Sequence, residues 1–550
     1  MKHLTLFCFL LGLAVSLFGQ NPTPTCYRVY LSDKNNSPYS ISNPSAYLSQ
    51  RAIDKRTRFN IPITEQDLPV NPQYKQQILA LNPQIQTIAV SKWMNTIAVY
   101  CPNSAIVPQI ESLPFVDSVV AIGSTALNAV SAASIPENPV PIVQNVPLST
   151  KDNIDYGNGF GQIALHNGQR LHAEGFHGEG MLIAVIDGGF VGIESNPFYP
   201  KLVNEGRLVG RYSLRPNFVD TSFVNGTRHG ARVTSIMAAD ENGQFVGTAP
   251  KASYALIHSE CNETEQPFEE DILANSIELA DSLGADVING SIAFYLFDDF
   301  PQGNHTYADM NGQTSIASRC ANLLAGKGIV TCISAGNYGN ENWYYISCPA
   351  DANNILAVGA CDYDSVMADF SSHGYSSDGR VKPDITSLGV NTYMYYSDNT
   401  LNQSFGTSYS CPVVSGLCAC LWQALPNRTA SEIMQMIRES SHLYHNPNPE
   451  FGYGIPDFYK AYSTHVGIHD YSPLQLNVYP NPVTDQLNIV NPDGNIQTVT
   501  LYNTSGQLVL QTAVSSSPIL EINVSSLPNG FYIGTATLNN HQTATFKFIK

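Results

Sequence analysis

The chain of 550 residues is too long for a single ordinary domain and predicts about three folded units. A hydrophobic content of 43% with 13% charged residues is typical of a globular protein that buries a large core. The net charge of −18 and the absence of a cluster of basic residues argue against a nucleic acid partner, because phosphate binding needs clustered Lys and Arg.

The first residues resemble an export signal. Met1-Lys2-His3 precedes the apolar run 4–18, which has the length of a signal-peptide core. We assign residues 1–20 to this signal, with cleavage near Gly19–Gln20. No later segment approaches the roughly 18 apolar residues of a membrane span, so we expect an exported protein without a transmembrane segment in its mature form.

Of the 11 cysteines, Cys8 lies in the signal, and the pairing of the others cannot be read from their spacing.

Residues 21–125 are predicted to form a small α+β unit, because short strand-like segments surround a helical one. The next stretch, 126–150, is rich in Ala, Ser, Pro and Asn, which is typical of an exposed linker and of a site of proteolytic cleavage. The predicted strands are 26–31, 87–90, 96–100 and 116–121, and the helix covers 75–81.

Residues 151–466 change to a pattern of apolar strand, Gly-rich turn and helix. Short all-apolar strands that alternate with helices predict an α/β fold, with a mostly parallel sheet covered on both faces. Active sites in such sheets lie at the carboxyl ends of the strands. The predicted strands are 181–186, 253–257, 287–289, 329–334 and 355–358, and the helices are 231–239, 271–283 and 314–325.

Residues 474–550 are predicted to be all-β and to form a small sandwich, because short strands alternate with Gly-containing turns. This unit has no cluster of catalytic residue types, so we interpret it as an address or binding module. The predicted strands are 476–479, 487–489, 498–502, 508–510, 519–524, 530–537 and 543–549, with turns at Pro492-Asp493-Gly494 and Pro528-Asn529-Gly530.

A serine at a predicted helix start is the first candidate nucleophile. In Gly406-Thr407-Ser408, Ser408 precedes the apolar run 413–421, so free backbone N–H groups and the helix dipole would face negative charge that develops beside it. The same pattern also fits an ordinary helix cap. The choice depends on whether a base, an orienting acid and an oxyanion donor lie elsewhere in the chain.

Three further residues can supply these roles. Asp187 follows a predicted strand and can orient a histidine. His229 opens a predicted helix, whose dipole favours the neutral ring. Asn337 follows another strand in a Gly-flanked turn and can present its amide to a carbonyl oxygen. Each alone is better explained as a turn or surface residue. Their chain order of Asp, His, Asn and then Ser is, however, that of subtilisin, and differs from the chymotrypsin and α/β-hydrolase orders.

Residues 161–462 accordingly resemble a subtilisin-family (subtilase) serine endopeptidase. The resemblance implies the subtilisin-like three-layer fold, with Ser408 as nucleophile, His229 as general base, Asp187 as its orienter and Asn337 as oxyanion donor. It also implies that Asn289, Gly290, Ser291 and Gly336 bind substrate. The matching motifs are 185–189, His229-Gly230, 287–291, 334–337, Asp369-Phe370-Ser371-Ser372, 382–385 and Gly406-Thr407-Ser408 with Pro412.

The sequence departs from the family pattern at several positions beside these motifs. Ala231 and Arg232 stand where Thr and a second His usually follow the histidine, and Gly188 replaces a usual Thr or Ser. Ala293 occupies a position where a Gly normally lines the S1 pocket. None of these changes removes a proton-transfer group, but pocket preference cannot be transferred from the family.

The flanking units resemble known modules as well. Residues 21–125 resemble a subtilase propeptide, which implies an intramolecular chaperone and inhibitor that is removed by self-cleavage in the linker. Residues 474–550 resemble the type A sorting domain of the type IX secretion system of Bacteroidetes, which implies a secreted protein or one attached to the outer-membrane surface. The motifs of the second resemblance are 478–483, 501–506, 527–532 and the terminal 547–550.

Together these observations predict a secreted, self-processed serine endopeptidase that acts on proteins or peptides. We expect it to require no cofactor and to have no metal at the site, whereas a structural calcium ion is left open because no loop has a recognisable ligand spacing. Two other hypotheses use the same residues: a catalytically inactive surface binding protein on a subtilase scaffold, and an esterase or peptide ligase with the same triad.

Overall fold

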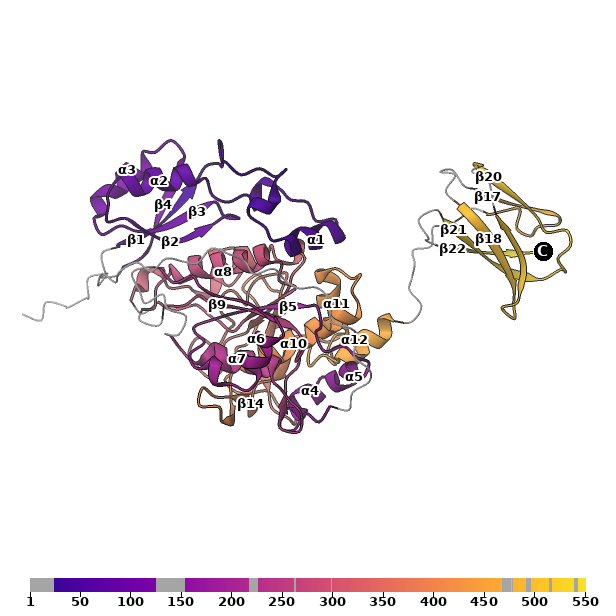
Figure 1. The fold of residues 1–550 in the computed structure, drawn as a ribbon. Coiled ribbons are helices and arrows are strands. Elements are labelled where there is room, and N and C mark those ends of the chain that lie inside the picture. Colours follow the sequence, from indigo (N-terminus) through magenta and orange to yellow (C-terminus); the bar gives the residue numbers. More distant parts are fainter. Residues whose placement is uncertain are drawn as a thin grey trace, which may run out of the picture. The chain divides into compact units, whose positions relative to one another are not determined.

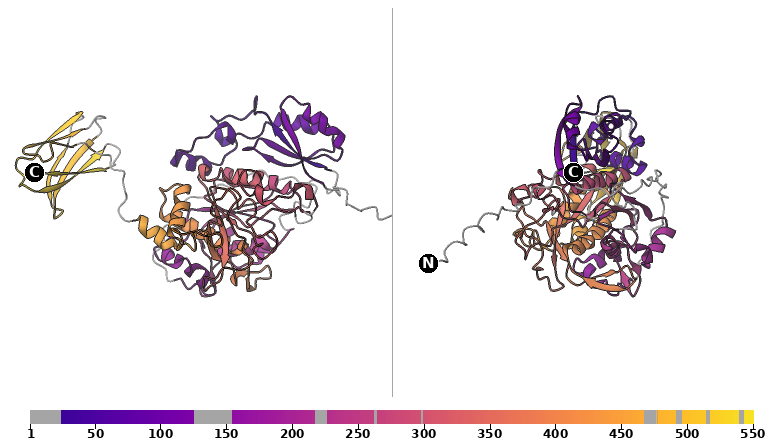
Figure 2. Two further views of the ribbon diagram at one scale, coloured as in Figure 1. Left: turned by 180° about the vertical axis from the view of Figure 1, so that it is seen from behind. Right: turned by 90° about the vertical axis from the view of Figure 1, so that its left-hand side faces the viewer.

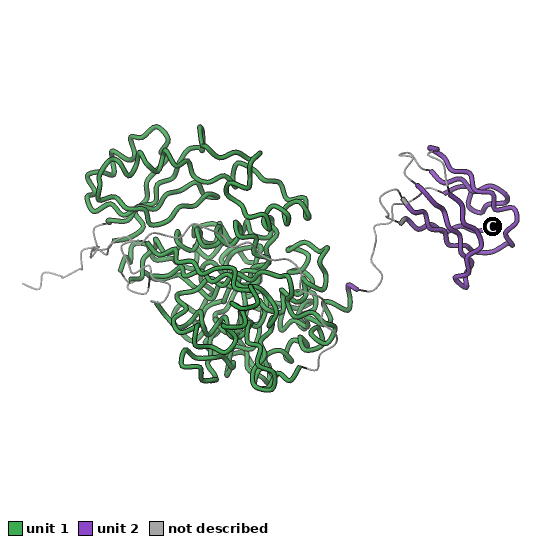
Figure 3. The backbone as a smooth tube through the Cα atoms, in the orientation of Figure 1, with its two compact units in different colours: residues 1–464 green, residues 465–550 purple. Residues whose placement is uncertain are grey.

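The structure is a computed structural model that divides into two compact units, residues 1–464 and 465–550 (Figure 3). The expected signal peptide 1–20, the linker 126–150 and the turn Pro492-Asp493-Gly494 lie outside the described residues. The described residues are 24–124, 154–216, 226–261, 264–297, 299–466, 476, 478–490, 496–513, 517–538 and 543–550.

The N-terminal part of the first unit is an antiparallel sheet with helices, as predicted for an α+β region. Its strand order is β2-β3-β1-β4, from β1 (Cys26–Leu31), β2 (Gln86–Ser91), β3 (Thr96–Tyr100) and β4 (Val116–Gly123). Helix α2 (Pro72–Ala80) begins after Asn71, whose side chain accepts a hydrogen bond from the Gln73 amide. Pro72 suits the first position of the helix because proline has no N–H group that would need an acceptor there. The remaining helices are α1 (Gln50–Arg58) and α3 (Val107–Glu111).

The central part of the first unit is a seven-stranded sheet in which every neighbouring pair is parallel. The strand order is β13-β12-β11-β10-β5-β9-β6, so the strands after which the candidate residues lie are neighbours. The strands are β5 (Leu182–Asp187), β6 (Leu208–Ser213), β9 (Ser253–His258), β10 (Val287–Gly290), β11 (Val330–Ser334), β12 (Leu356–Cys361) and β13 (Ile385–Leu388).

Helices cover both faces of this sheet, which confirms the predicted three-layer fold (Figure 1). Alternate residues of β5 enter different cores. Ile183 and Val185 pack with α7 (His229–Ala238) and α10 (Thr407–Ala424), whereas Leu182, Ala184 and Ile186 pack with α8 (Glu269–Leu283) and α9 (Ile316–Ala321). The other helices are α4 (Phe160–Ala164), α5 (Gly168–Ala173), α6 (Phe198–Asn204), α11 (Ala430–Ser440) and α12 (Phe458–His465). Two small two-stranded sheets complete this part of the unit. One pairs β7 (Asp240–Glu241) with β8 (Phe245–Val246), and the other pairs β14 (Thr392–Tyr395) with β15 (Leu401–Ser404).

Helix α8 connects the two parts of the first unit, because it lies between the central sheet and the N-terminal sheet (Figures 1 and 2). A shared apolar cluster forms there between Ile88 and Ala98 of the N-terminal sheet and Phe268 and Ile272 at the start of α8. No helix in the described part of the chain is long and apolar enough to cross a membrane.

The second unit contains two antiparallel sheets that share one core. One sheet has the order β16-β17-β20 and the other β19-β18-β21-β22. Leu487 and Ile522 of the first sheet pack with Val499 and Phe546 of the second, which confirms the predicted sandwich. Its strands are β16 (Val478–Tyr479), β17 (Gln486–Val490), β18 (Ile496–Asn503), β19 (Leu508–Ala513), β20 (Ile519–Asn523), β21 (Phe531–Leu538) and β22 (Thr543–Ile549).

The cysteines among the described residues are all buried, and none of them forms a disulfide there. Cys411 and Cys418 lie in the core around α10, as expected of small apolar residues on a helix. The Cys332 and Cys418 sulfur atoms lie 3.8 Å apart. The described part of the first unit is therefore held by packing and ion pairs without a disulfide.

Candidate active site

Asp187 and His229 meet at the carboxyl edge of the central sheet. Asp187 is the last residue of β5 and is fully buried, and its Oδ1 also accepts a hydrogen bond from the Gly188 amide at 2.8 Å. The His229 Nδ1 atom lies 2.9 Å from Asp187 Oδ1 and 3.0 Å from Oδ2. This hydrogen bond fixes the ring orientation and leaves Nε2 as the basic nitrogen.

The close contact depends on Gly230, the second residue of α7. A Cβ atom there would lie 2.7 Å from the Gly189 carbonyl oxygen and 2.9 Å from Asp187 Cβ. The Gly230 amide instead donates to the Gly189 carbonyl at 2.8 Å, which holds the first turn of α7 against the end of β5. A larger residue would move the helix, and the His229 ring with it, away from Asp187.

Ser408 lies at the second position of α10 and is partly exposed. Gly406, which precedes the helix, has a φ angle of 141°, a backbone conformation that residues other than glycine rarely adopt. The turn thus places Ser408 at the start of an 18-residue helix, where the first amides have no partner within the helix.

The Asn337 amide is held in one orientation by Thr407. The Asn337 Oδ1 atom accepts hydrogen bonds from the Thr407 amide at 2.8 Å and from the Thr407 hydroxyl at 2.9 Å. The Gly336 amide in turn donates to the Thr407 hydroxyl at 3.2 Å. Because Oδ1 is occupied, Nδ2 is the end of the amide that can donate to a ligand.

The segment Asn289-Gly290-Ser291 follows β10 and is tied to α10. The Ser291 hydroxyl donates to the Ser408 carbonyl at 2.9 Å, and Asn289 Nδ2 donates to Ser291 Oγ at 3.2 Å. The Ser415 hydroxyl donates to Asn289 Oδ1 at 2.9 Å. The fully buried Asn289 side chain therefore joins the end of β10 to the helix that carries Ser408.

The structure brings the predicted residues together at one edge of the sheet, with one contact missing. His229 is bonded to Asp187, and its ring centroid lies 5.5 Å from that of Tyr409, the neighbour of Ser408. Among the described residues, no hydrogen bond joins His229 to Ser408. Catalytic hydrogen bonds are often long without substrate and tighten in the Michaelis complex.

Glu260 is a charged neighbour of the site that the motifs did not identify. It follows β9, the strand beside β5, and the intervening Ser259 donates its amide to the Asp187 carbonyl at 3.1 Å. A Cβ atom on Gly188 would lie 2.3 Å from Glu260 Oε2. The glycine at position 188 therefore makes room for this carboxylate, and the strand-end rule that selected Asp187 also points to Glu260.

The charges around His229 raise its pKa above the usual value. Burial opposes the charged ring, but the charge and hydrogen bond of Asp187 outweigh this effect, and Glu260 adds to them while Arg232 acts in the opposite direction. Burial, together with the Asp187 charge, raises the pKa of the Glu260 carboxyl to about 8. The site thus couples one histidine to two carboxyl groups.

Residues 178–454 match the subtilase family profile, and they make up half of the chain. The chain belongs to the subtilase family. The subtilase region is preceded by a match to the peptidase S8 propeptide domain of Bacteroidota at residues 26–137, and followed by a match to a secretion system C-terminal sorting domain at residues 477–550.

Curated relatives of this subtilase are serine proteases. Subtilisin DY of Bacillus licheniformis is 27% identical over 284 residues, which is 51% of this chain and 90% of that protein. Serine protease AprX of Bacillus subtilis is 26% identical over 309 residues, 52% of this chain and 65% of the relative. Subtilisin-like protease PopC of Myxococcus xanthus is 29% identical over 281 residues, 48% of this chain and 56% of the relative.

Among solved structures, the chain is similar to the prenylagaramide maturation protease PagA, with 19% identity and a TM-score of 0.43 over 54% of this chain and 98% of that one.

The family matches confirm the resemblances of the central and flanking regions. The protein is a subtilisin-like serine protease with a propeptide, and its C-terminal sorting domain marks it as a secreted or surface protein.

Proposed function

We propose that this subtilase is an endopeptidase that cleaves peptide bonds through an acyl-enzyme on Ser408. His229 Nε2 takes the hydroxyl proton as Ser408 attacks the carbonyl carbon, and Asp187 stabilises the imidazolium that forms. His229 then gives the proton to the leaving amine, and water hydrolyses the ester by the same route in reverse. The observation that carries this proposal is the hydrogen bond of 2.9 Å between His229 Nδ1 and Asp187 Oδ1 beside the Ser408 helix.

The proposed oxyanion donors are Asn337 Nδ2 and the Ser408 amide. The Asn337 side chain is fixed through its oxygen by Thr407, so its nitrogen need not reorient when charge develops on the substrate. We further propose that the backbone around Gly290, Ser291 and Gly336 contacts the substrate. The buried Asn289 side chain fits a positioning role, because it already bonds to Ser291 and Ser415.

The proposed zymogen depends on contacts between the propeptide and the subtilase region. Arg28 forms an ion pair of 2.6 Å with Asp271, and Arg56 forms one of 2.9 Å with Asp281. The Glu278 carboxylate also accepts hydrogen bonds from the Ser91 hydroxyl and from the Lys92 and Trp93 amides. Several of these groups are fully buried, which favours a propeptide that stays bound as an inhibitor after cleavage.

The end of the propeptide sheet is held by one side chain that pairs with backbone. Gln266 Oε1 accepts from the Ser124 amide at 3.0 Å, and Gln266 Nε2 donates to the Ser124 carbonyl at 2.7 Å. Such a two-bond contact binds an extended chain irrespective of its side chains. We propose that it directs the chain that follows Ser124 toward self-cleavage within residues 126–150.

The proposed organisation is a signal peptide at 1–20, a propeptide at 21–125, a linker at 126–150, a catalytic domain at 151–466 and a sorting domain at 474–550. The family matches at 26–137, 178–454 and 477–550 support the presence of three units in this order, and the first match extends into the proposed linker. Protein or peptide substrates, the protein's own propeptide and the type IX secretion machinery are the proposed partners.

A fluorophosphonate probe tests the proposed nucleophile directly, because it reacts only with an activated serine. We expect labelling of the mature protein and none of the Ser408→Ala variant. Ser410→Ala is the matched control, since Ser410 lies on the same helix and its buried hydroxyl donates to the Thr407 carbonyl. A mature protein that is not labelled would support the inactive-scaffold hypothesis, and activity on esters alone would support the esterase hypothesis.

A further inference from the structure

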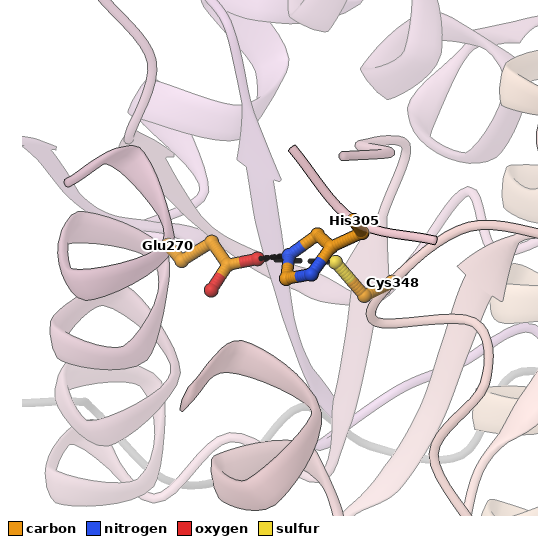
Figure 4. Close-up of side chains that lie close together, drawn as sticks. All are labelled: Glu270, His305 and Cys348. Atoms are coloured by element: carbon orange, nitrogen blue, oxygen red, sulfur yellow. Dashed lines mark hydrogen bonds and ion pairs between the residues drawn. The ribbon is translucent and has the colours of Figure 1, made fainter. Parts of the chain in front are cut away.

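Three side chains with metal-binding atoms converge away from the catalytic residues. Glu270 lies in the first turn of α8, His305 in the segment after Phe300, and Cys348 in the segment that follows β11 (Figure 4). One ligand atom of each lies within 4.8 Å of the others. Their spacing in the chain matches no metal motif, because the fold alone brings the three segments together.

The carboxylate is the centre of the cluster. Glu270 Oε1 accepts a hydrogen bond from His305 Nε2 at 2.5 Å and another from the Cys348 thiol at 3.2 Å. Glu270 and Cys348 are buried, and the His305 side chain is only 11% exposed. Both donors therefore point at the same oxygen atom, from which a single ion would displace both protons.

We propose that Glu270, His305 and Cys348 bind one Zn²⁺ ion. Carboxylate oxygen, imidazole nitrogen and thiolate sulfur are the three ligand types that zinc takes in proteins, and a thiolate disfavours calcium and magnesium. The Phe294 carbonyl oxygen, which lies 3.1 Å from Cys348 Sγ and is an alternative acceptor for the thiol proton, is a further oxygen atom beside the cluster.

A bound zinc ion would leave the buried cluster without net charge. The Glu270 carboxylate and the Cys348 thiolate contribute −1 each, a neutral His305 ring contributes nothing, and Zn²⁺ contributes +2. The thiol proton is released to solvent when zinc binds, as is any second proton on the ring. The zinc-bound cluster therefore avoids the cost of an uncompensated buried ion.

The surrounding electrostatics favour a cation at this position. The negative charges of Glu270, Asp309 and Asp351 act on the His305 ring in the direction that favours positive charge there, against the effect of burial. Arg28 is a positive charge near Glu270 that would oppose a bound cation, but its ion pair with Asp271 compensates this charge. The full burial of Cys348 also shields the thiol from oxidation outside the cytoplasm.

The ion would stabilise the segment that leads away from the proposed substrate-binding residues. Phe294 and Cys348 exchange backbone hydrogen bonds of 2.8 and 3.2 Å, and the His305 amide donates to the Tyr295 carbonyl at 2.9 Å. Phe294 follows Ser291, whose hydroxyl binds the Ser408 carbonyl. Zinc would thus join α8 to the two loops that support this segment.

The first experiment measures metal content in the full-length Ser408→Ala chain, which cannot digest itself by the proposed mechanism. After removal of metal with a chelator and dialysis against Zn²⁺, we expect about one zinc ion per chain by mass spectrometry. We expect Cys348→Ser to lose it, whereas Cys361→Ser should keep it, since Cys361 is equally buried but its thiol donates to the Ser387 carbonyl, away from the cluster. Equal zinc binding in the two variants would overturn the proposal.

A second measurement does not depend on whether the variants fold. Co²⁺ in place of Zn²⁺ should give a thiolate-to-cobalt charge-transfer band and visible bands of tetrahedral intensity in the Ser408→Ala chain itself. Zinc should also raise the unfolding temperature of this chain. A cobalt-loaded chain without the charge-transfer band would overturn the proposal and leave the cluster as an ion pair with a neutral thiol.

Discussion

The Asn337 side-chain oxygen accepts hydrogen bonds from both the amide and the hydroxyl of Thr407, the residue immediately before Ser408. The proposed oxyanion donor and the proposed nucleophile are therefore parts of one hydrogen-bonded unit. Motion of the helix start would move both groups together, which preserves their separation during the reaction.

The Thr407 hydroxyl should contribute to catalysis without contacting the substrate. We predict that Thr407→Val lowers kcat by about tenfold with little change in KM, because Asn337 keeps one of its two anchors. Asn337→Ala, which removes the donor, should lower kcat by roughly 10²–10³. Steady-state kinetics on a peptide substrate measures both.

Thr331→Val is the matched control for this change. The Thr331 hydroxyl is buried on β11 and is without a hydrogen-bond partner in the part of the chain that the structure describes. Its loss should leave kcat unchanged. A kcat for Thr407→Val equal to that of the control would show that Asn337 is positioned by other contacts.

Activity should fall with decreasing pH as His229 becomes protonated. Since the pKa of His229 is raised, the midpoint should lie above that of an ordinary histidine, with activity lost below the midpoint and kept above it. The pH profile of kcat/KM measures this pKa in the free enzyme. A midpoint below the usual histidine range would contradict the assigned effect of Asp187.

Two neighbours should shift this midpoint in opposite directions. Glu260→Gln removes a negative charge and should move the midpoint to lower pH, whereas Arg232→Gln removes a positive charge and should move it to higher pH. The Glu260 shift should be modest, because the pKa of about 8 for that carboxyl leaves it only partly charged where His229 titrates. Shifts of the same sign in both variants would exclude this electrostatic account.

Arg56 should determine how long the propeptide stays bound. Its guanidinium is buried and bonds to Asp281 of the subtilase region. Arg56→Ala leaves that carboxylate short of a partner, which should weaken the contact by about 2 kcal/mol or more, or roughly 30-fold in affinity. Less cleaved propeptide should copurify with the enzyme, and activity should appear earlier.

Asp117→Ala serves as the control for this prediction, because Asp117 is an exposed residue of β4 in the same propeptide. It should mature and copurify as the unmutated chain does. If Arg56→Ala behaved like this control, the ion pairs on α8 would not contribute to retention of the propeptide.

Asp384 should be a main contributor to the stability of the central domain. Its buried carboxylate bonds to Lys382 at 2.7 Å and to Arg438 at 2.9 Å, and it accepts from the Ala357 amide at 2.9 Å. Asp384→Ala leaves the buried Lys382 and the partly buried Arg438 without this partner and should lower the free energy of unfolding by about 3–5 kcal/mol. Thermal unfolding in the Ser408→Ala background measures the loss, with exposed Asp364→Ala as the control.

The same prediction has a pH dependence. Burial alone would raise the pKa of Asp384, but Lys382 and Arg438 outweigh it and lower the pKa below the usual aspartate range. The stabilisation is therefore present above the unfolded-state pKa and is lost as pH falls through the folded-state pKa. The difference in unfolding temperature between Asp384→Ala and its parent should shrink in strong acid, and a constant difference would contradict this assignment.

Much of the fold could be predicted because it depends on short-range patterns. The apolar runs of β5, β9, β10, β11 and β12 are fully or almost fully buried strands, so their sequences show no alternation and are easily recognised. Strand β6 was missed because it is an edge strand with Gly210 and Arg211 in its middle. Strand β13 was missed because it is a four-residue strand that contains Thr386 and Ser387.

The candidate site could be predicted where residues follow strands or begin helices. The pairing of His229 with Asp187 follows from the parallel order of the sheet together with Gly230 at the start of α7. Side-chain contacts between distant segments could not be predicted in this way. The bond from Thr407 to Asn337 depends on the packing of loops, for which the chain carries no periodic signal.

The most direct test of the account is the intact mass of the secreted Ser408→Ala chain. We predict that the unmutated chain and Ser410→Ala both lose a segment that ends within residues 126–150, while Ser408→Ala keeps its propeptide covalently attached. A Ser408→Ala chain that is cut within the linker and still digests casein would contradict the assignment of Ser408 as the nucleophile.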